Sequence, residues 1–266
     1  MRGGRQPCQD TRKERGKLME NNLTDRAFWK SFWESRKNLI FQLKPDYVFG
    51  DILAKLIVDN GVKNAIELGG FPGYYSIYLK KYQQLDTTLF DYYVHDGLVK
   101  ELLAKNGLKD GDIKIIEADL FNYTPAEKYD MVLSFGLIEH FSDTAAIIKT
   151  HLQFLKPGGA LFITLPNFTG VNGWVQRKFD LDNYNKHYID CMNPALLADT
   201  CKALGLKNIE SYYHGRFSTW LENREQKSGF AKAVVKGIWL AGKIFTKVVP
   251  VESKMLSPYI VLRAEK

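Results

Sequence analysis

The stretch Ala65-Ile66-Glu67-Leu68-Gly69-Gly70-Phe71-Pro72-Gly73 decides the fold of this chain. Its apolar run breaks at the glycines and is followed by a helical pattern over 74–82. In a strand, glycine turn and helix, the backbone can approach a nucleotide-like ligand without Cβ atoms in the way. A dinucleotide fingerprint, G-x-G-x-x-G, needs glycines at 69, 71 and 74, and Phe71 and Tyr74 break that pattern.

Strand and helix patterns alternate on either side of this stretch, which predicts a mostly parallel α/β sheet with helices on both faces. An amphipathic pattern over 47–60 predicts a helix that leads into the first strand. The seven predicted strands are 65–68, 87–90, 113–116, 129–135, 160–165, 209–213 and 259–263. The last of them is expected to close the sheet.

Composition indicates one globular α/β domain. The chain has 266 residues, of which 45% are hydrophobic and 25% charged. Its three cysteines, Cys8, Cys191 and Cys201, lack C-x-x-C spacing, so neither a disulfide framework nor a zinc site is predicted. No apolar leader opens the sequence, and a cytoplasmic protein is expected.

The net charge of +7 is concentrated in two segments. Residues 1–18 hold six basic and two acidic side chains, a net of +4, and residues 226–250 hold five lysines and no acid. The rest of the chain is therefore at −2. A nucleic-acid enzyme usually spreads basic residues around its active face, so no nucleic-acid partner is predicted.

Acidic residues follow three successive strands. In an open α/β sheet the ligand lies beyond the carboxyl ends of the strands, where Glu67, Asp91 and Asp119 stand. The carboxylate of Asp91 can accept hydrogen bonds from both ribose hydroxyls, and that of Asp119 from an adenine amino group. Any one of these acids alone would more often cap a turn, but three in succession indicate a ligand site.

Residues 61–213 resemble a class I S-adenosylmethionine (SAM) methyltransferase of the small-molecule type. Glu67, Gly69 and Gly73 are similar to motif I of that family, E/D-x-G-x-G-x-G, with Phe71 in place of the middle glycine. The runs YDMVLSFGLIEHF over 129–141 and LKPGGALFI over 155–163 resemble its fourth- and fifth-strand motifs. The pair Glu139-His140 is typical of the ubiquinone and menaquinone biosynthesis branch.

The resemblance implies a Rossmann-like fold and SAM as cofactor. Glu67, Gly69, Gly70 and Gly73 would lie at the methionine part, Asp91 at the ribose, Asp119 and Leu120 at the adenine, and Phe135 and Gly136 at the sulfonium.

Methyl transfer from a sulfonium needs alignment and exclusion of water, and an O-methylation also needs a base. His140 is the best candidate, with a structural histidine as the alternative, and His187 is the second, with a packed surface loop as the alternative. Some quinone O-methyltransferases bind a divalent ion with E-x-x-E-H, but the first position here is Gly136. No metal is therefore predicted.

Two aromatic segments are candidates for the substrate site. Residues 23–41 predict a helix capped by Thr24-Asp25. It would dock on the core or form a lid that brings Trp29 and Trp33 to the substrate, as in many class I methyltransferases. Tyr184 and Tyr188 fall where the substrate loop of the family lies, or in a packed surface loop.

These features predict a methyltransferase that acts on a small-molecule or lipid-like acceptor by O- or C-methylation. The alternatives are a SAM-binding protein without turnover, which the Phe71 substitution keeps open, and a protein methyltransferase. The predicted organisation is a disordered basic tail over 1–18, a helical cap over 19–60 and the methyltransferase domain over 61–266. No pattern specifies the acceptor or an oligomeric state.

A basic amphipathic helix is predicted at about 228–250. At about 100° per residue, Lys232, Lys236, Lys243 and Lys247 share one stripe, and nearly every other position is apolar. Three interpretations are open: a helix packed on the sheet with its lysines in solvent, a dimer contact, or a peripheral helix over 230–249 on an anionic membrane surface.

Overall fold

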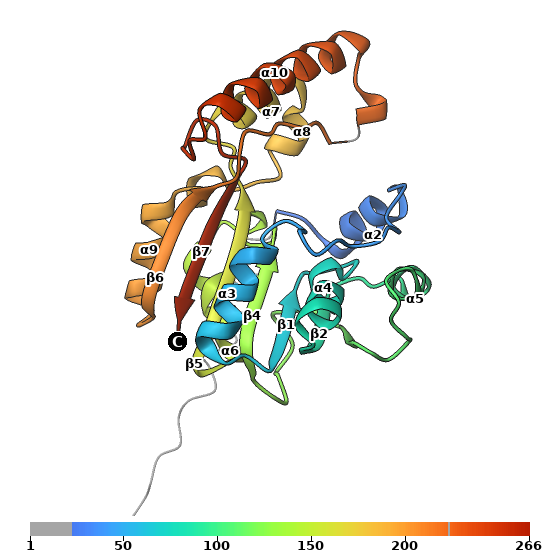
Figure 1. Cartoon of the computed structure of the whole chain (residues 1–266), viewed down its shortest axis with the longest axis vertical. Coiled ribbons are helices and arrows are strands. Elements are labelled where there is room, and N and C mark those ends of the chain that lie inside the picture. Colours follow the sequence, from blue (N-terminus) through green and yellow to red (C-terminus); the bar gives the residue numbers. More distant parts are fainter. Residues whose placement is uncertain (1–22, 223) are drawn as a thin grey trace, which may run out of the picture.

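The computed structural model describes residues 23–222 and 224–266, and the predicted tail over 1–18 lies outside them. Its centre is a seven-stranded sheet of order β3-β2-β1-β4-β5-β7-β6 (Figure 1). The strands are β1 (Asn64–Leu68), β2 (Asp86–Asp91), β3 (Lys114–Glu117), β4 (Tyr129–Phe135), β5 (Leu155–Pro166), β6 (Lys207–His214) and β7 (Tyr259–Glu265). The predicted Rossmann-like, mostly parallel sheet is confirmed.

The last strand does not lie at the edge of the sheet, although it was expected to close it. β7 pairs antiparallel with both β5 and β6, with Pro166 opposite Tyr259 and His214 opposite the same Tyr259. The chain re-enters the sheet at the carboxyl end of β5, so β7 runs back along β5 and leaves β6 outermost.

Helices cover both faces of the sheet, as predicted. On one face lie α3 (Gly50–Asn60), α4 (Tyr74–Gln83) and α5 (Asp96–Lys105), and on the other α6 (Thr144–Phe154) and α9 (Pro194–Ala203). Alternation along β4 explains the division, because Met131 and Leu133 belong to the first core while Val132 belongs to the second. Each fully buried aliphatic side chain contributes about 1.5–3 kcal/mol.

A short helix stands off the sheet near the carboxyl ends of the strands. In α2 (Arg26–Glu34), the Asp25 carboxylate caps the helix by accepting from the backbone N–H of Phe28 at 2.7 Å. None of the residues of α2 is buried, although four are large aromatics. The helix therefore lies outside both cores, although its Trp33 packs against the first of them.

The end of the molecule beyond β5 carries α7 (Val171–Phe179), α8 (Leu181–Tyr184) and α10 (Gly229–Val248) (Figure 1). Short 3₁₀ turns are η1 (Ile138–His140), η2 (Ile189–Cys191) and η3 (Arg224–Gln226). Within 23–222 and 224–266, no helix combines the length and apolarity needed to cross a bilayer.

Candidate active site

A cavity of about 910 Å³ opens at the carboxyl ends of the parallel strands, with α2 along one side. The glycine turn after β1, the ends of β2, β4 and β5, and the turn η1 supply its walls. The predicted site residues that line it are Trp29, Trp33, Glu67, Gly69, Gly70, Asp91, Asp119, Leu120, Phe135, Gly136, His140 and His187. The fold thus brings most of the predicted site together.

Two positions of the glycine turn, Gly69 and Gly70, have no room for a Cβ. Gly69 has a φ of 62°, in the left-handed region, and a Cβ there would lie 2.6 Å from Leu137 Cδ1. A Cβ on Gly70 would lie 2.3 Å from Glu67 Cγ. Gly73 lies behind the turn, at the N-cap of α4, and is not among the lining residues.

The buried carboxylate of Glu67 ties the glycine turn to α4. It accepts hydrogen bonds from the backbone N–H of Ser76 at 2.7 Å and from the Ser76 hydroxyl at 2.6 Å. Burial raises its pKa to about 7, against the opposing effect of these hydrogen bonds. Glu67 therefore fixes the glycine turn relative to α4, and it also lines the cavity.

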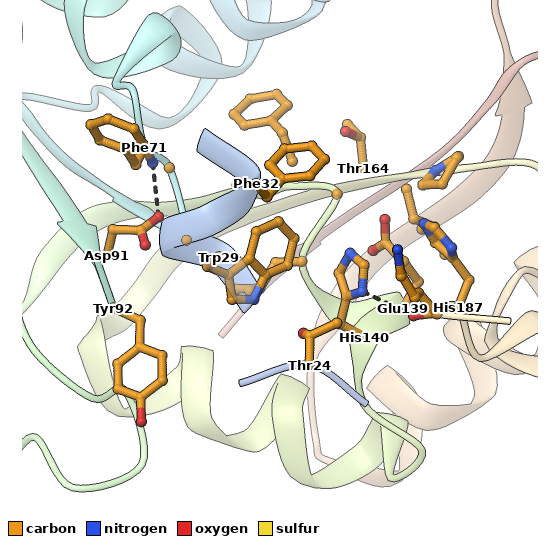
Figure 2. Close-up of a pocket in the computed structure, with 18 of the residues that line it drawn as sticks. Thr24, Trp29, Phe32, Phe71, Asp91, Tyr92, Glu139, His140, Thr164 and His187 are labelled. Carbon is orange, nitrogen blue, oxygen red and sulfur yellow. Dashed lines mark hydrogen bonds between the residues drawn. The ribbon is translucent and has the colours of Figure 1, made fainter. Parts of the chain in front are cut away.

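Asp91 is positioned by the same turn. Its Oδ2 accepts from the backbone N–H of Phe71 at 2.9 Å (Figure 2). Its Oδ1 accepts from the backbone N–H of Tyr93 at 3.0 Å. Burial raises the pKa of this carboxyl to about 6. Two hydrogen bonds leave acceptor capacity on both oxygens, which suits a pair of ligand hydroxyls.

Asp119 and Phe135 are held by their own neighbours. Asp119 accepts from the backbone N–H of Phe121 at 3.0 Å and the side chain of Asn122 at 2.6 Å. The ring of Phe135 stacks on that of Tyr75, with 6° between the planes. Both side chains are therefore fixed before any ligand arrives.

Two histidines lie at the opposite wall from Asp91 (Figure 2). His140 Nδ1 lies 3.0 Å from the carbonyl oxygen of Lys186, and His187 Nδ1 lies 2.7 Å from that of Asn183. A carbonyl only accepts, so each Nδ1 carries the proton and each Nε2 keeps its lone pair. Burial lowers the pKa of His140 to about 3 and also lowers that of His187, so both rings are neutral at pH 7.

Glu139 is a cavity residue that was not among the predicted site residues. Its side chain is buried, its Oε2 has no hydrogen-bond partner, and burial raises its pKa to about 8. One ligand atom each of Glu139, His140 and His187 lies within 4.8 Å of the others. Two imidazoles and a carboxylate are donors that divalent ions accept. In the sequence, the adjacent pair Glu139-His140 was the available signal for this cluster, because His187 is remote from the pair in sequence.

The aromatic helix α2 contacts both ends of the site. The Trp29 ring meets His140 edge-on at 5.0 Å between centroids, and the Trp33 ring meets Phe71 edge-on at 5.2 Å. Phe71, at the position of the missing glycine, thus packs against α2. The helix α2 therefore combines both predicted roles, because it lines the cavity and also docks on the rest of the protein.

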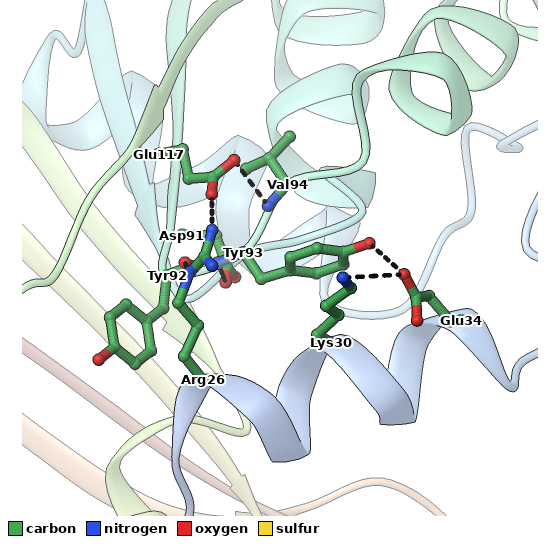
Figure 3. A network of polar contacts seen from close by, with 8 residues as sticks. All are labelled: Arg26, Lys30, Glu34, Asp91, Tyr92, Tyr93, Val94 and Glu117. Carbon is green, nitrogen blue, oxygen red and sulfur yellow. Dashed lines mark hydrogen bonds and ion pairs between the residues drawn. The ribbon is translucent and has the colours of Figure 1, made fainter.

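Polar contacts also hold α2 over the strand ends (Figure 3). Arg26 pairs with Glu117 at the end of β3 and donates to the Tyr92 carbonyl at 3.0 Å. The Tyr93 hydroxyl lies 3.1 Å from Glu34 Oε1. These partly exposed contacts contribute little each, so the polar contacts hold α2 only weakly.

Two predicted substrate residues do not line the cavity. Tyr184 lies behind Phe168, with 6.3 Å between ring centroids. The backbone N–H of Tyr188 donates to the Glu139 carbonyl at 2.7 Å, so this residue anchors η1 through its main chain. The aromatic side chains of Tyr184 and Tyr188 therefore belong to the packing behind the cavity wall.

A family model described as a methyltransferase domain matches residues 33–211, more than half of the chain. The chain belongs to the methyltransferase-domain family. This confirms the predicted resemblance to the class I methyltransferases, while the ubiquinone and menaquinone branch stays a prediction. No curated protein is significantly similar to this methyltransferase in sequence.

Solved structures share the fold at low identity. The Haemonchus contortus phosphoethanolamine N-methyltransferase 2 complex with SAM is 16% identical, over 95% of this chain and 60% of that one, with a TM-score of 0.56. Coclaurine N-methyltransferase with N-methylheliamine and S-adenosylhomocysteine (SAH) is 13% identical, over 99% and 90%, with a TM-score of 0.54. A putative methyltransferase from Bacillus halodurans is 16% identical, over 82% and 99%, with a TM-score of 0.53.

The chain spans only 56% and 60% of the Haemonchus protein in its two structures. These identities support a common fold, and the ligands named belong to those proteins.

Proposed function

We propose that this chain transfers the methyl group of SAM to a small-molecule acceptor. The observation that carries the proposal is one cavity with a carboxylate and a glycine turn at one end and two neutral histidines at the other. The first end has the chemistry of a nucleoside site and the second that of a proton-accepting site.

The residues at the first end suit SAM. Gly69 and Gly70 line the cavity on a turn in which a Cβ would collide with Leu137 or Glu67, and Asp91 has acceptor capacity for the two ribose hydroxyls. By the family resemblance, Asp119 and Leu120 take the adenine and Phe135 and Gly136 the sulfonium side. SAM supplies an activated methyl group when bound, so the chain has to align the acceptor and keep water out.

The second end suits an acceptor that loses a proton, as in O- or C-methylation. The Nε2 atoms of His140 and His187 accept hydrogen bonds, and the low pKa of His140 makes it an orienting acceptor more than a strong base. The aromatic rings of Phe28, Trp29 and Phe32 border the same space. Apolar rings with a few polar groups favour an aromatic or lipid-like acceptor.

A SAH-release assay tests this proposal. The purified chain is incubated with SAM and, separately, with phenols, quinols, amines and activated-carbon compounds, and any copurified ligand is identified by mass spectrometry. We expect SAH formation with a hydroxyl or carbon acceptor, and the methyl group on that acceptor. Amines test the N-methylation named for the structural neighbours.

The second candidate is a SAM-binding protein without turnover, favoured by Phe71 at the position of a family glycine. SAM binding with no SAH released from any acceptor would support it and overturn the proposed transfer. Methylation of a protein substrate, with none of a small molecule, would instead make the chain a protein methyltransferase.

A further inference from the structure

The helix α10 has three distinct faces. Its packed face holds Ala231, Val235 and Thr246, which are its buried residues. Gly242 belongs to the same face, because a Cβ there would lie 2.0 Å from the ring of Phe217. At about 100° per residue, these four positions fall within about 60° of one another. The helix is thus held to the protein along one narrow edge.

A second face of α10 is apolar and open to solvent. It lies about 160° from the packed face, on the opposite side of the helix. Its large residues are Phe230 (74% exposed), Leu240 (52%), Ile244 (60%) and Val248 (78%). A helix face that contacts only water does not normally carry four large apolar side chains. Such a surface normally contacts another apolar phase.

The lysines form the third face, between the other two. Lys232, Lys236, Lys243 and Lys247 lie about 100° from the packed face and about 100° from the apolar face. None of them forms an ion pair with a carboxylate among residues 23–222 and 224–266. Lys243 instead lies over the ring of Trp239, 5.7 Å from its centroid. The positive charge of this face is therefore not neutralised within the described part of the chain.

We propose that α10 binds the surface of an anionic lipid bilayer, with its axis in the membrane plane. Leu240, Ile244 and Val248 enter the acyl boundary, and the lysines alongside reach the headgroups. The proposal goes beyond the proposed reaction, because it concerns a surface that contributes no residue to the cavity.

Charge favours the bilayer over a second copy of the chain. Residues 226–250 contain no acid. Two α10 helices packed face to face would therefore bring their lysines together, and neither helix has a carboxylate to neutralise them. An anionic bilayer supplies the opposite charge and the apolar phase together. The fold also places α10 beyond β5, at the end of the sheet where the cavity opens (Figure 1).

Vesicle co-sedimentation of the full chain tests the proposal. The vesicles are phosphatidylcholine alone and phosphatidylcholine mixed with phosphatidylglycerol. One variant carries Lys236→Glu with Lys243→Glu, and another carries Leu240→Ser with Ile244→Ser. Lys105→Glu with Lys109→Glu makes the same charge change at the end of the distant α5 and in the segment that follows it, and Val58→Ser removes an exposed apolar side chain of α3.

We expect binding to the anionic vesicles that weakens in high salt. The α10 charge variant should partition at least tenfold less, since each lysine near such a surface is worth roughly a factor of five. The apolar variant should also lose binding, and both controls should keep it. Circular dichroism verifies that each variant is folded.

Three results would overturn the proposal. The first is no sedimentation of the folded wild type with anionic vesicles. The second is equal loss in the Lys105→Glu, Lys109→Glu control, which would mean that only net charge matters. The third is a dimer in analytical ultracentrifugation that Leu240→Ser with Ile244→Ser dissociates, which would assign the apolar face to a second copy.

Discussion

The rings of His140 and His187 lie 4.8 Å apart between centroids, and each directs Nδ1 at a backbone carbonyl of the segment 183–186. The main chain therefore sets the tautomer of both histidines. Their Nε2 lone pairs are available in one part of the cavity, next to the buried carboxyl of Glu139.

Replacing His140 by Ala should reduce kcat far more than the affinity for SAM, by about 10²-fold or more. The reason is that His140 faces the acceptor end of the cavity, away from Asp91. Steady-state kinetics and SAM titration measure the two effects. His140→Gln, which keeps an acceptor, should recover part of the rate, and His95→Asn, which keeps a capping side chain at the exposed N-cap of α5, should match wild type. Equal losses of rate and SAM affinity would make His140 a structural residue.

The buried carboxyl of Glu139 should make stability fall as the pH rises from about 4.5 to about 8. Its folded pKa of about 8 lies above the ordinary value of 4.5, so the native state holds a proton that the unfolded chain releases. This contribution is complete below pH 4.5 and is lost as the pH rises through 8. Between pH 6 and 9 the free energy of unfolding should fall on the order of 2 kcal/mol more in wild type than in Glu139→Gln.

Urea unfolding at several pH values measures this difference. The exposed Glu101→Gln serves as control and should keep the wild-type slope. A Glu139→Gln variant with the wild-type pH dependence would mean that Glu139 is not the titrating group.

The contact between Trp33 and Phe71 should couple α2 to the glycine turn. We expect the two Ala variants and their double mutant to show an interaction energy of about 0.5–1.5 kcal/mol, as for an edge-on aromatic pair. Both single variants should also raise the KM for the acceptor, because α2 borders the cavity. Additive effects on unfolding would show that α2 does not depend on Phe71.

The sequence was most informative where local pattern and position in the fold coincide. Alternation and glycine punctuation located β4 at 129–135 and placed Asp91 and Asp119 at strand ends. The carboxyl ends of parallel strands meet at one edge, so these residues had to converge. The acids could therefore be assigned to one site without knowing any helix packing.

The parts that depend on tertiary contact were not predictable in the same way. The position of β7 inside the sheet follows from where α10 returns the chain, which no local pattern encodes. Tyr184 lies at the end of α8 and packs behind Phe168, and the aromatic content of 180–188 alone cannot tell a lining ring from a packed one. The three faces of α10 needed the positions of its buried residues as well as its lysine stripe.

Calorimetric titration with SAH tests the central claim, that the strand-end cavity is a SAM site, most directly. The wild type should bind one SAH with a saturable heat. Asp91→Ala should weaken binding by about 1–3 kcal/mol, roughly 5- to 150-fold, because the ribose hydroxyls lose a charged acceptor. No binding by the folded wild type, or an unchanged dissociation constant in folded Asp91→Ala, would contradict the account.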